Sequence, residues 1–245
     1  MFSMMLREWR AQRGMSQLDL ALSAEVSTRH VSFIESERSK PSAEMVLRLV
    51  EALDLPLRER NAMLVAAGFA PQFGDSRWDS PEMEEVRRAA TLLLAAHAPY
   101  PALVLDMAFN ILDANPAALE MIGADRTVLG KVNLVDLVFM PGQVRESIVN
   151  WSDVAEYLLH RMREGVRRHG PHSAMGTVMR RAMMQPGTAA LSMVRSHWRG
   201  SVLLPLAFHA NGQTTRWFTT VTSFGAPQDA MAEEITIEQF HPNPG

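Results

Sequence analysis

The side chains in this sequence that are best suited to chemistry lie in a short polar run between Ser27 and Ser32. Arg29 is the main candidate within the run, because a guanidinium group can donate two hydrogen bonds to O6 and N7 of guanine. Gln17, earlier in the chain, has an amide side chain and a backbone amide that could both meet a phosphate. The chemistry that these residue types indicate is the reading of duplex DNA.

The elements that would position these side chains are short helices in the segment before Gly68. The first is expected over 4–13. Ser16 and Ser27 have the residue type that caps helix N-termini, and Asp19 would complete a capping box with Ser16. Because only residues 25–27 separate the second helix from the third, the two must cross steeply as a helix-turn-helix, with 27–32 exposed. The later helices are expected over 28–36, from Pro41-Ser42, and from Pro56, which makes five in all.

The run SQLDLALSAEVSTRHVSFIESERSKPSAEMVLRLVEALDLPLRERNAML combines an SQ pair, a tight turn, a third helix, an ExxR pattern and a PS pair. In this combination, over about residues 4–69, it resembles the XRE and phage-repressor class of helix-turn-helix DNA-binding domains. The resemblance implies that base edges are faced by Thr28, Arg29, Ser32 and Phe33, and that phosphates are approached by Gln17, His30, Arg38 and Lys40. Phe33 could equally lie half in the core, and an exposed His30 near phosphate is a simpler interpretation than a pH sensor.

Three acidic residues around the third helix need a structural explanation. Glu25 and Glu37 stand where the family often has glycine, which adopts a positive φ readily; if the family geometry is kept, each substitution should cost about 1 kcal/mol. Glu35 is expected to pair with Arg10 or Arg13 behind the third helix, because an unpaired carboxylate would repel phosphate.

The composition argues against catalysis. The sequence has no cysteine, so disulfides, thiolate metal sites and cysteine nucleophiles are excluded. The motifs GxSxG, GxGxxG and GKS/T are absent from it. His169 and His172 could bind a metal, but no further ligand lies near them in the sequence. We therefore expect no catalytic residues, no metal and no cofactor, and a protein that is not an enzyme.

The formal net charge of −3 over 245 residues means that any contact with nucleic acid must come from a local patch. No stretch approaches the ~18 consecutive apolar residues of a membrane span. The N-terminal sequence lacks the apolar core and small-residue cleavage site of a secretory signal. We expect a cytoplasmic protein with no membrane partner.

Beyond a polar break at 75–81, the pattern changes from all-helical to mixed. A helix that opens with acidic residues is expected over 82–96, and short strands around a turn within 101–115. A hairpin is expected around Asn211-Gly212. Residues 116–195 have a mainly helical pattern, with a long amphipathic helix over about 152–169. The expected fold class is therefore α+β, with an N-terminal all-α five-helix helix-turn-helix domain followed by an antiparallel sheet with covering helices.

The mixed part is rich in methionine and large apolar residues, which together could line a pocket. Methionine is unbranched and adapts to irregular cavities, so a Met-lined interior suits a flexible apolar ligand. The alternative is that these side chains simply fill the core. The candidate pocket walls are Leu105, Phe109, Met162, Met179, Met183, Leu204, Phe208, Trp217 and Phe218.

The segment PALVLDMAFNILDANPAALEMIG is similar to the opening of a PAS fold, with a strand, a turn, a second strand and a helix. The wider run to about residue 242 resembles the MmyB-like ligand-binding domain, which commonly follows an XRE-type helix-turn-helix in bacterial regulators. This resemblance implies a PAS-like sheet with helices over one face and a pocket for a fatty acid or similar amphiphile. Candidates to hold a carboxylate head group are Arg145, Arg180, Arg181, Arg195 and His209.

We thus expect a DNA-binding domain over 1–70, a linker and connecting helix over 71–96, and a ligand-binding domain over 97–245. The expected function is that of a transcription regulator that binds double-stranded operator DNA as a homodimer, with its affinity altered by an apolar small ligand. Two other functions stay open. The C-terminal domain could serve only for dimerisation, or the helix-turn-helix could target an enzyme to DNA.

Overall fold

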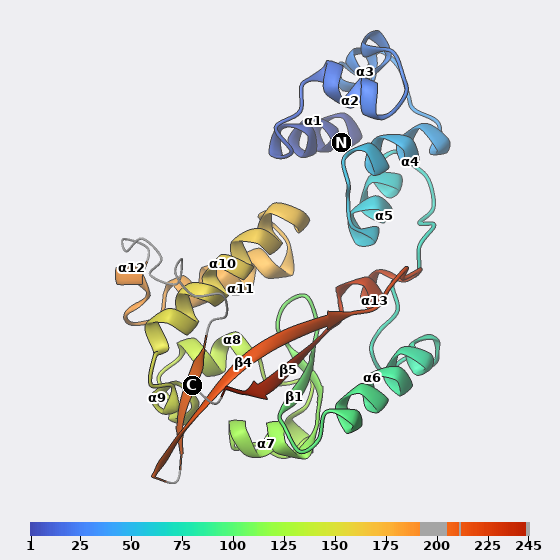
Figure 1. The fold of residues 1–245 in the computed structure, drawn as a ribbon. Helices are drawn as coiled ribbons and strands as arrows, with labels where there is room; N and C mark the ends of the chain where they lie inside the picture. Colours follow the sequence, from blue (N-terminus) through green and yellow to red (C-terminus); the bar gives the residue numbers. More distant parts are fainter. Residues whose placement is uncertain (192–204, 211, 244–245) are drawn as a thin grey trace. The chain divides into compact units, whose positions relative to one another are not determined.

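The computed structural model describes residues 1–191, 205–210 and 212–243 (Figure 1). The chain divides into two compact units. The first contains Met1–Ser76 together with residues 167–169 and 227–233, and the second contains the remainder of the chain. This division places the helix that was expected over 82–96 inside the second unit.

Five helices form most of the first unit, and a short helix near the C-terminus contributes to it (Figure 1). Serine side chains cap three of them, since Ser16, Ser27 and Ser42 each accept a hydrogen bond from the backbone amide three residues on. Asp19 completes the predicted capping box with Ser16. The helices are α1 (Phe2–Gln12), α2 (Gln17–Ser23), α3 (Thr28–Glu35), α4 (Ala43–Ala52), α5 (Leu57–Ala66) and α13 (Ala230–Glu234).

The turn between α2 and α3 depends on a left-handed residue at Glu25, whose φ is +55°. This conformation lets the Val26 amide donate back to the Ala21 carbonyl at 2.9 Å. Glu37 ends α3 in the same way with φ +60°, and the Arg38 amide donates to the Phe33 carbonyl at 2.8 Å. Both residues therefore have the positive φ that glycine adopts readily at these positions.

Replacing Glu25 with glycine should stabilise the first unit by roughly 1 kcal/mol, because glycine adopts a positive φ without the clash of a Cβ atom. Glu25→Ala is the matched control, since it removes the same charge but keeps a Cβ in the left-handed conformation. Thermal unfolding of the two variants beside the wild type measures the difference. An equal change in both variants would show that the charge, and not the backbone, is responsible.

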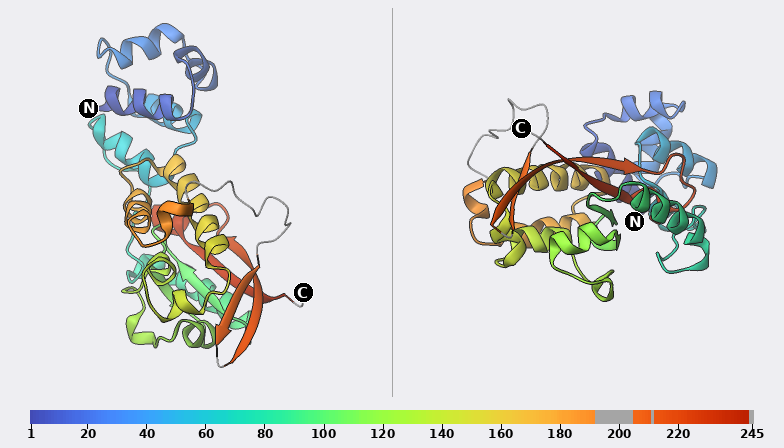
Figure 2. Two further views of the ribbon diagram at one scale, coloured as in Figure 1. Left: turned by 90° about the vertical axis from the view of Figure 1, so that its left-hand side faces the viewer. Right: turned by 60° about the horizontal axis from the view of Figure 1, so that its bottom comes forward.

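The second unit contains a five-stranded antiparallel sheet in the order β2-β1-β5-β4-β3. Both views of Figure 2 show the long β4 as a curved arrow, with helices packed beside the sheet. The elements are η1 (Pro81–Met83), α6 (Glu84–Ala96), β1 (Ala102–Leu105), β2 (Ile111–Ala114), α7 (Pro116–Ile122), η2 (Arg126–Val128), α8 (Leu134–Phe139), α9 (Gln143–Ser147), α10 (Trp151–His169), α11 (Ala174–Met183), α12 (Thr188–Leu191), β3 (Leu206–Ala210), β4 (Gln213–Ser223) and β5 (Thr236–Pro242). The α+β fold class is confirmed.

Strand pairing determines which side chains face the helices. Phe240 pairs with Thr219, and Glu238 pairs with both Leu103 and Val221. Because directly paired residues point to the same face of a sheet, these side chains share one face. Phe240 and Leu103 belong to the main buried cluster with residues of α8, α10 and α11, so this is the helix-covered face.

The sequence expectations for the sheet are partly fulfilled. β1 and β2 pair as predicted, and β3 and β4 form the predicted hairpin, although Asn211 lies outside the described residues. The central strand β5 was missed, although it joins the two hairpins into one sheet. Its pattern does not alternate strictly, because the adjacent Ile237 and Glu238 are both buried, so a search for period-two hydrophobicity does not find it.

Candidate functional site

The first candidate site is the surface at the start of α3 and just after it. Val31 and Ile34 turn into the core of the first unit and Glu35 is also buried, while Thr28, Arg29, His30, Ser32 and Phe33 are exposed or half-buried. Among the residues predicted to contact DNA, Gln17, Thr28, His30, Ser32 and Phe33 are half-buried and Ser27, Arg29, Arg38 and Lys40 are exposed. Three of the predicted contact residues are therefore exposed cations, Arg29 within α3 and Arg38 and Lys40 just after it.

Phe33 supports two of these cations. Its ring centroid lies 5.0 Å from the guanidinium carbon of Arg29 and 5.9 Å from that of Arg38. Both distances are within the range of a cation–π interaction. Stacking on the same ring restricts both arginines, so less side-chain entropy is lost when they bind a partner.

Glu35 joins α3 to the two preceding helices. Its carboxylate accepts two hydrogen bonds from Arg10, at 2.7 and 3.0 Å, and one from the Gln17 side chain at 2.7 Å. Arg10 also donates to the Met15 carbonyl at 2.8 Å. The predicted structural pairing of Glu35 is confirmed, with Arg10 as the partner. The Gln17 side chain is engaged in this network, so its backbone amide at the start of α2 is the group left to meet a phosphate.

The pKa of Glu35 is the net result of opposing effects. Burial raises the pKa, but the hydrogen bonds from Arg10 and Gln17 and the charge of Arg10 outweigh it, so the pKa lies below its ordinary value. A carboxyl whose pKa is lower in the folded state stabilises the fold above its unfolded pKa, and that stabilisation is lost as the pH falls through the folded pKa.

We therefore expect the urea midpoint of the first unit to fall as the pH is lowered from 5 to 3. Glu35→Gln should show a smaller fall, because the titrating group is gone. Circular dichroism at each pH follows the unfolding. Equal pH dependence in the wild type and the variant would contradict this role for Glu35.

The second candidate site is an apolar cavity on the helix-covered face of the sheet, which we call the sheet cavity. Its walls come from α7, α8, α9, α10 and the three strands β3, β4 and β5. Most of the lining is aliphatic or aromatic, and the polar lining residues are Tyr157, Thr219 and Glu238. The others are Met121, Ile122, Leu134, Val138, Val144, Ile148, Val154, Leu158, Leu206, Phe208 and Phe240.

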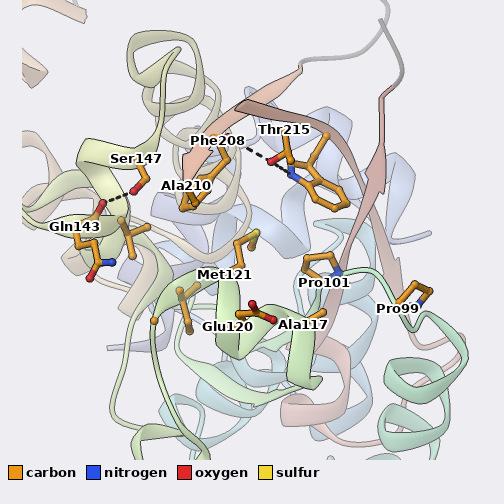
Figure 3. Close-up of a pocket in the computed structure, with 14 residues that line it drawn as sticks. Pro99, Pro101, Ala117, Glu120, Met121, Gln143, Ser147, Phe208, Ala210 and Thr215 are labelled. Carbon is orange, nitrogen blue, oxygen red and sulfur yellow. Dashed lines mark hydrogen bonds between the residues drawn. The ribbon is translucent and has the colours of Figure 1, made fainter. Parts of the chain in front are cut away.

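A more polar cavity adjoins it, which we call the rim cavity. Figure 3 shows Glu120 and Met121 of α7 facing Phe208 and Thr215 of the β3–β4 hairpin, with Gln143 to one side. The Trp217 indole donates to the Thr215 hydroxyl at 3.0 Å. The rim and sheet cavities share four lining residues, which are Met121, Ile122, Val144 and Phe208. A chain-like ligand that occupied both would pass these four side chains.

The candidate pocket walls are only partly brought together. Phe208 lines both cavities and Trp217 lines the rim cavity. Leu105, Phe109 and Met162 are buried in the main cluster, with Met179 packed against it, and none of them lines either cavity. Met183 is 45% exposed.

The last two candidate walls lie elsewhere. Phe218 is on the opposite face of the sheet, where it stacks on His241 with ring centroids 4.9 Å apart. The prediction that Phe218 lines the pocket is therefore wrong. Phe218 follows Trp217 in β4, and successive residues of a strand point to opposite faces. Leu204 lies outside the described residues.

The cations expected to hold a carboxylate head group are occupied by other partners. Arg145 donates to the Phe139 and Pro186 carbonyls and stacks on Trp151. Arg181 pairs with Asp136 at 2.7 Å. The other two described candidates, Arg180 and His209, contact Pro171 and Thr214. Arg195 lies outside the described residues.

The polar residues that sequence reasoning missed are Tyr157, Arg161, Thr219 and Glu238. Arg161 of α10 donates to Glu238 of β5 at 2.8 Å, and Glu238 is 4% exposed. Burial raises the pKa of Tyr157 above its ordinary value. No local motif joins residues so distant in sequence, and the one available signal was a charged residue at an inward position of a strand.

The described residues contain no group of three side chains that could hold a metal ion, including around His169 and His172. In the described part of the chain, every helix is too short or too polar to cross a membrane.

Comparisons with known proteins give matches to both parts of the chain. The family model for the MmyB-like transcription regulator ligand binding domain matches residues 86–244, and a helix-turn-helix model matches residues 6–60. No curated protein matches the chain. Solved structures that match include the crystal structure of the PAS domain of an HTR-like protein from Haloarcula marismortui. That match has a TM-score of 0.27 and 14% identity, and covers 66% of this chain and 98% of the other.

Proposed function

This chain belongs to the family of the MmyB-like transcription regulator ligand-binding domain, and since a helix-turn-helix precedes that domain, we propose that it regulates transcription by sequence-specific binding to operator DNA under the control of a small ligand. A DNA-binding transcription regulator is what the two family matches support together. The two family matches do not identify the operator or the ligand.

The observation that carries the DNA-binding part is the cationic surface of α3. Arg29 and Arg38 stack on Phe33, and the Arg10–Glu35–Gln17 network fixes the helix behind them. In this proposal Thr28, Arg29, Ser32 and Phe33 face the bases, while the phosphate contacts come from Gln17, Ser27, His30, Arg38 and Lys40. Two copies of the chain would bind two half-sites one helical turn apart, as helix-turn-helix dimers do.

The ligand is proposed to be a fatty-acid-like or other apolar amphiphile in the sheet and rim cavities. The support is the aliphatic and aromatic lining of the sheet cavity beside the more polar rim. Each buried methylene contributes about 0.8 kcal/mol, so a long chain gains enough to bind tightly. The ligand controls DNA affinity only if it binds one state of the protein better than another.

A regulator of this kind has no catalytic role and acts in the cytoplasm, where bacterial DNA lies. The competing proposals are a C-terminal domain that only dimerises the chain and an enzyme targeted to DNA. A C-terminal domain that only dimerises the chain would not need the apolar cavity. For the second, the polar groups that line the sheet cavity are few, and the one charged group among them, Glu238, is paired with Arg161.

Two experiments on the purified full-length protein test the proposal. Selection of duplexes from a random DNA library should enrich one sequence with two related half-sites, whereas failure to enrich any sequence contradicts sequence-specific binding. Mass spectrometry of an organic extract should identify co-purified long-chain compounds in about equimolar amount. Their repeated absence, together with no uptake of added long-chain compounds, favours the dimerisation domain.

A further inference from the structure

The charges that line the cavities are unevenly distributed. Among the described residues, the charged side chain of the sheet cavity is Glu238 and that of the rim cavity is Glu120. Both are carboxylates. A cation, Lys131, lines a third cavity that adjoins the rim cavity, together with the carboxylate Asp136. The lining is therefore poorly matched to an anionic head group.

Glu238 is placed to act as an acceptor inside the sheet cavity. Its side chain shares the helix-covered face with Phe240, and its exposed fraction is 4%. One oxygen, Oε2, accepts from Arg161 at 2.8 Å, while the hydrogen bonds among the described residues leave Oε1 without a donor. Tyr157 and Thr219 are the other polar groups of the same cavity. A donor on a ligand is the group that would complete this cluster.

Arg161 balances the charge of Glu238 and is itself held in place. Its guanidinium carbon lies 5.1 Å from the Phe109 ring centroid and 5.7 Å from that of Tyr157. The pair is therefore neutral as a unit, and its carboxylate is almost fully buried. A carboxylate brought beside it would add an uncompensated negative charge, and an ammonium group would add a positive one. Either addition carries a large desolvation penalty.

We propose that the ligand is an electrically neutral long-chain amphiphile whose hydroxyl group donates a hydrogen bond to Glu238. The proposal rests on the ligand-binding function proposed above and narrows it from fatty-acid-like compounds to long-chain alcohols. The alkyl chain lies against the aliphatic walls of α8 and α10, such as Leu134, Val138 and Leu158, and runs toward the rim cavity. The neutral head group leaves the Arg161–Glu238 pair intact.

The test compares three probes of equal chain length with the delipidated full-length protein at pH 7. The probes are 1-dodecanol, kept below its solubility limit, and dodecanoate and dodecylammonium, kept below their critical micelle concentrations, each in a calorimetric titration. We expect 1-dodecanol to bind at least about tenfold more tightly than either charged probe, because only the charged probes leave a buried charge unpaired. In Glu238→Gln, the affinity for 1-dodecanol should fall about tenfold. The affinity for dodecanoate should rise, because Arg161 has lost its carboxylate partner.

Glu120→Gln is the matched control, because it neutralises the carboxylate of the rim cavity and leaves Glu238 untouched. It should not change the order of the three probes. A change in that order would place the head group at the rim and overturn the proposal. Thermal unfolding shows whether Glu238→Gln folds. If it does not, the comparison of the three probes on the wild-type protein still tests the proposal.

The remaining outcomes separate this inference from the proposed function. Dodecanoate binding as tightly as 1-dodecanol would overturn the inference and leave an apolar-ligand regulator in place. Lys131→Gln would then show whether the third cavity holds the carboxylate. Failure of all three probes to bind would overturn the inference and the ligand-binding function together.

Discussion

Arg29→Ala is expected to weaken binding to the selected operator duplex by about tenfold to hundredfold, because one bidentate contact to guanine is worth about 1–3 kcal/mol. Binding to unrelated duplexes should fall much less, so that specificity is relaxed. The side chain is exposed and stacks only on Phe33, so the fold and ligand uptake should survive. A gel-shift titration with the selected and a scrambled duplex measures both effects.

The matched control for this experiment is Arg48→Ala, which removes an exposed arginine of α4 that pairs with Glu44. It takes away the same charge from the same unit but not from α3, so operator binding should change by less than about twofold at moderate salt. Unchanged operator affinity in Arg29→Ala, or an equal loss in both variants, would contradict the assignment of Arg29 to base reading.

Glu35→Ala is expected to destabilise the first unit by roughly 3 kcal/mol. The substitution leaves the mainly buried Arg10 charge without its partner, and removal of one member of a buried pair is far more harmful than loss of a surface pair. It also frees the Gln17 side chain and loosens α3, so operator affinity should fall with stability. Chemical unfolding, followed by circular dichroism, gives the change in free energy.

Glu44→Ala provides the comparison, because its pair with Arg48 is exposed, with 76% of the Glu44 side chain accessible. Its effect should stay within about 0.5 kcal/mol. If Glu35→Ala destabilised the protein no more than Glu44→Ala, the network behind α3 would not be the support described above.

The DNA-binding unit was largely predictable because its signals are local. Ser16, Ser27 and Ser42 mark helix starts within a few residues of the positions that they cap. The positive φ at Glu25 and Glu37 agrees with the glycine that the resembled family often has at these two positions. The contact of Glu35 with Arg10 needed only the assumption that a lone carboxylate must be paired.

The ligand-binding unit was less predictable because its geometry depends on pairing between distant strands. The face to which Phe218 points is determined by the register of β4 with β5, and β5 itself was missed. The alternation of a strand identifies two faces but not which one is covered by helices. Phe109 and Met162 are of residue types that can line a pocket, but both are packed inside the buried core cluster.

The polar side chains of the cavity were even less predictable from the sequence. Arg161 and Glu238 come from a helix and a strand that only the complete fold brings together. The arginines that stood out in the sequence, Arg145 and Arg181, are held by backbone carbonyls and by Asp136. Composition could therefore indicate an apolar pocket but not the chemistry of its polar end.

Occupancy of the cavity is expected to change the affinity of the helix-turn-helix for DNA. The most direct measurement is the Kd of the selected operator duplex for the full-length protein, first delipidated and then saturated with the extracted compounds or with 1-dodecanol. We expect the two Kd values to differ by at least about tenfold, which corresponds to about 1.4 kcal/mol of coupling free energy. Equal Kd values with a demonstrably bound ligand would contradict it.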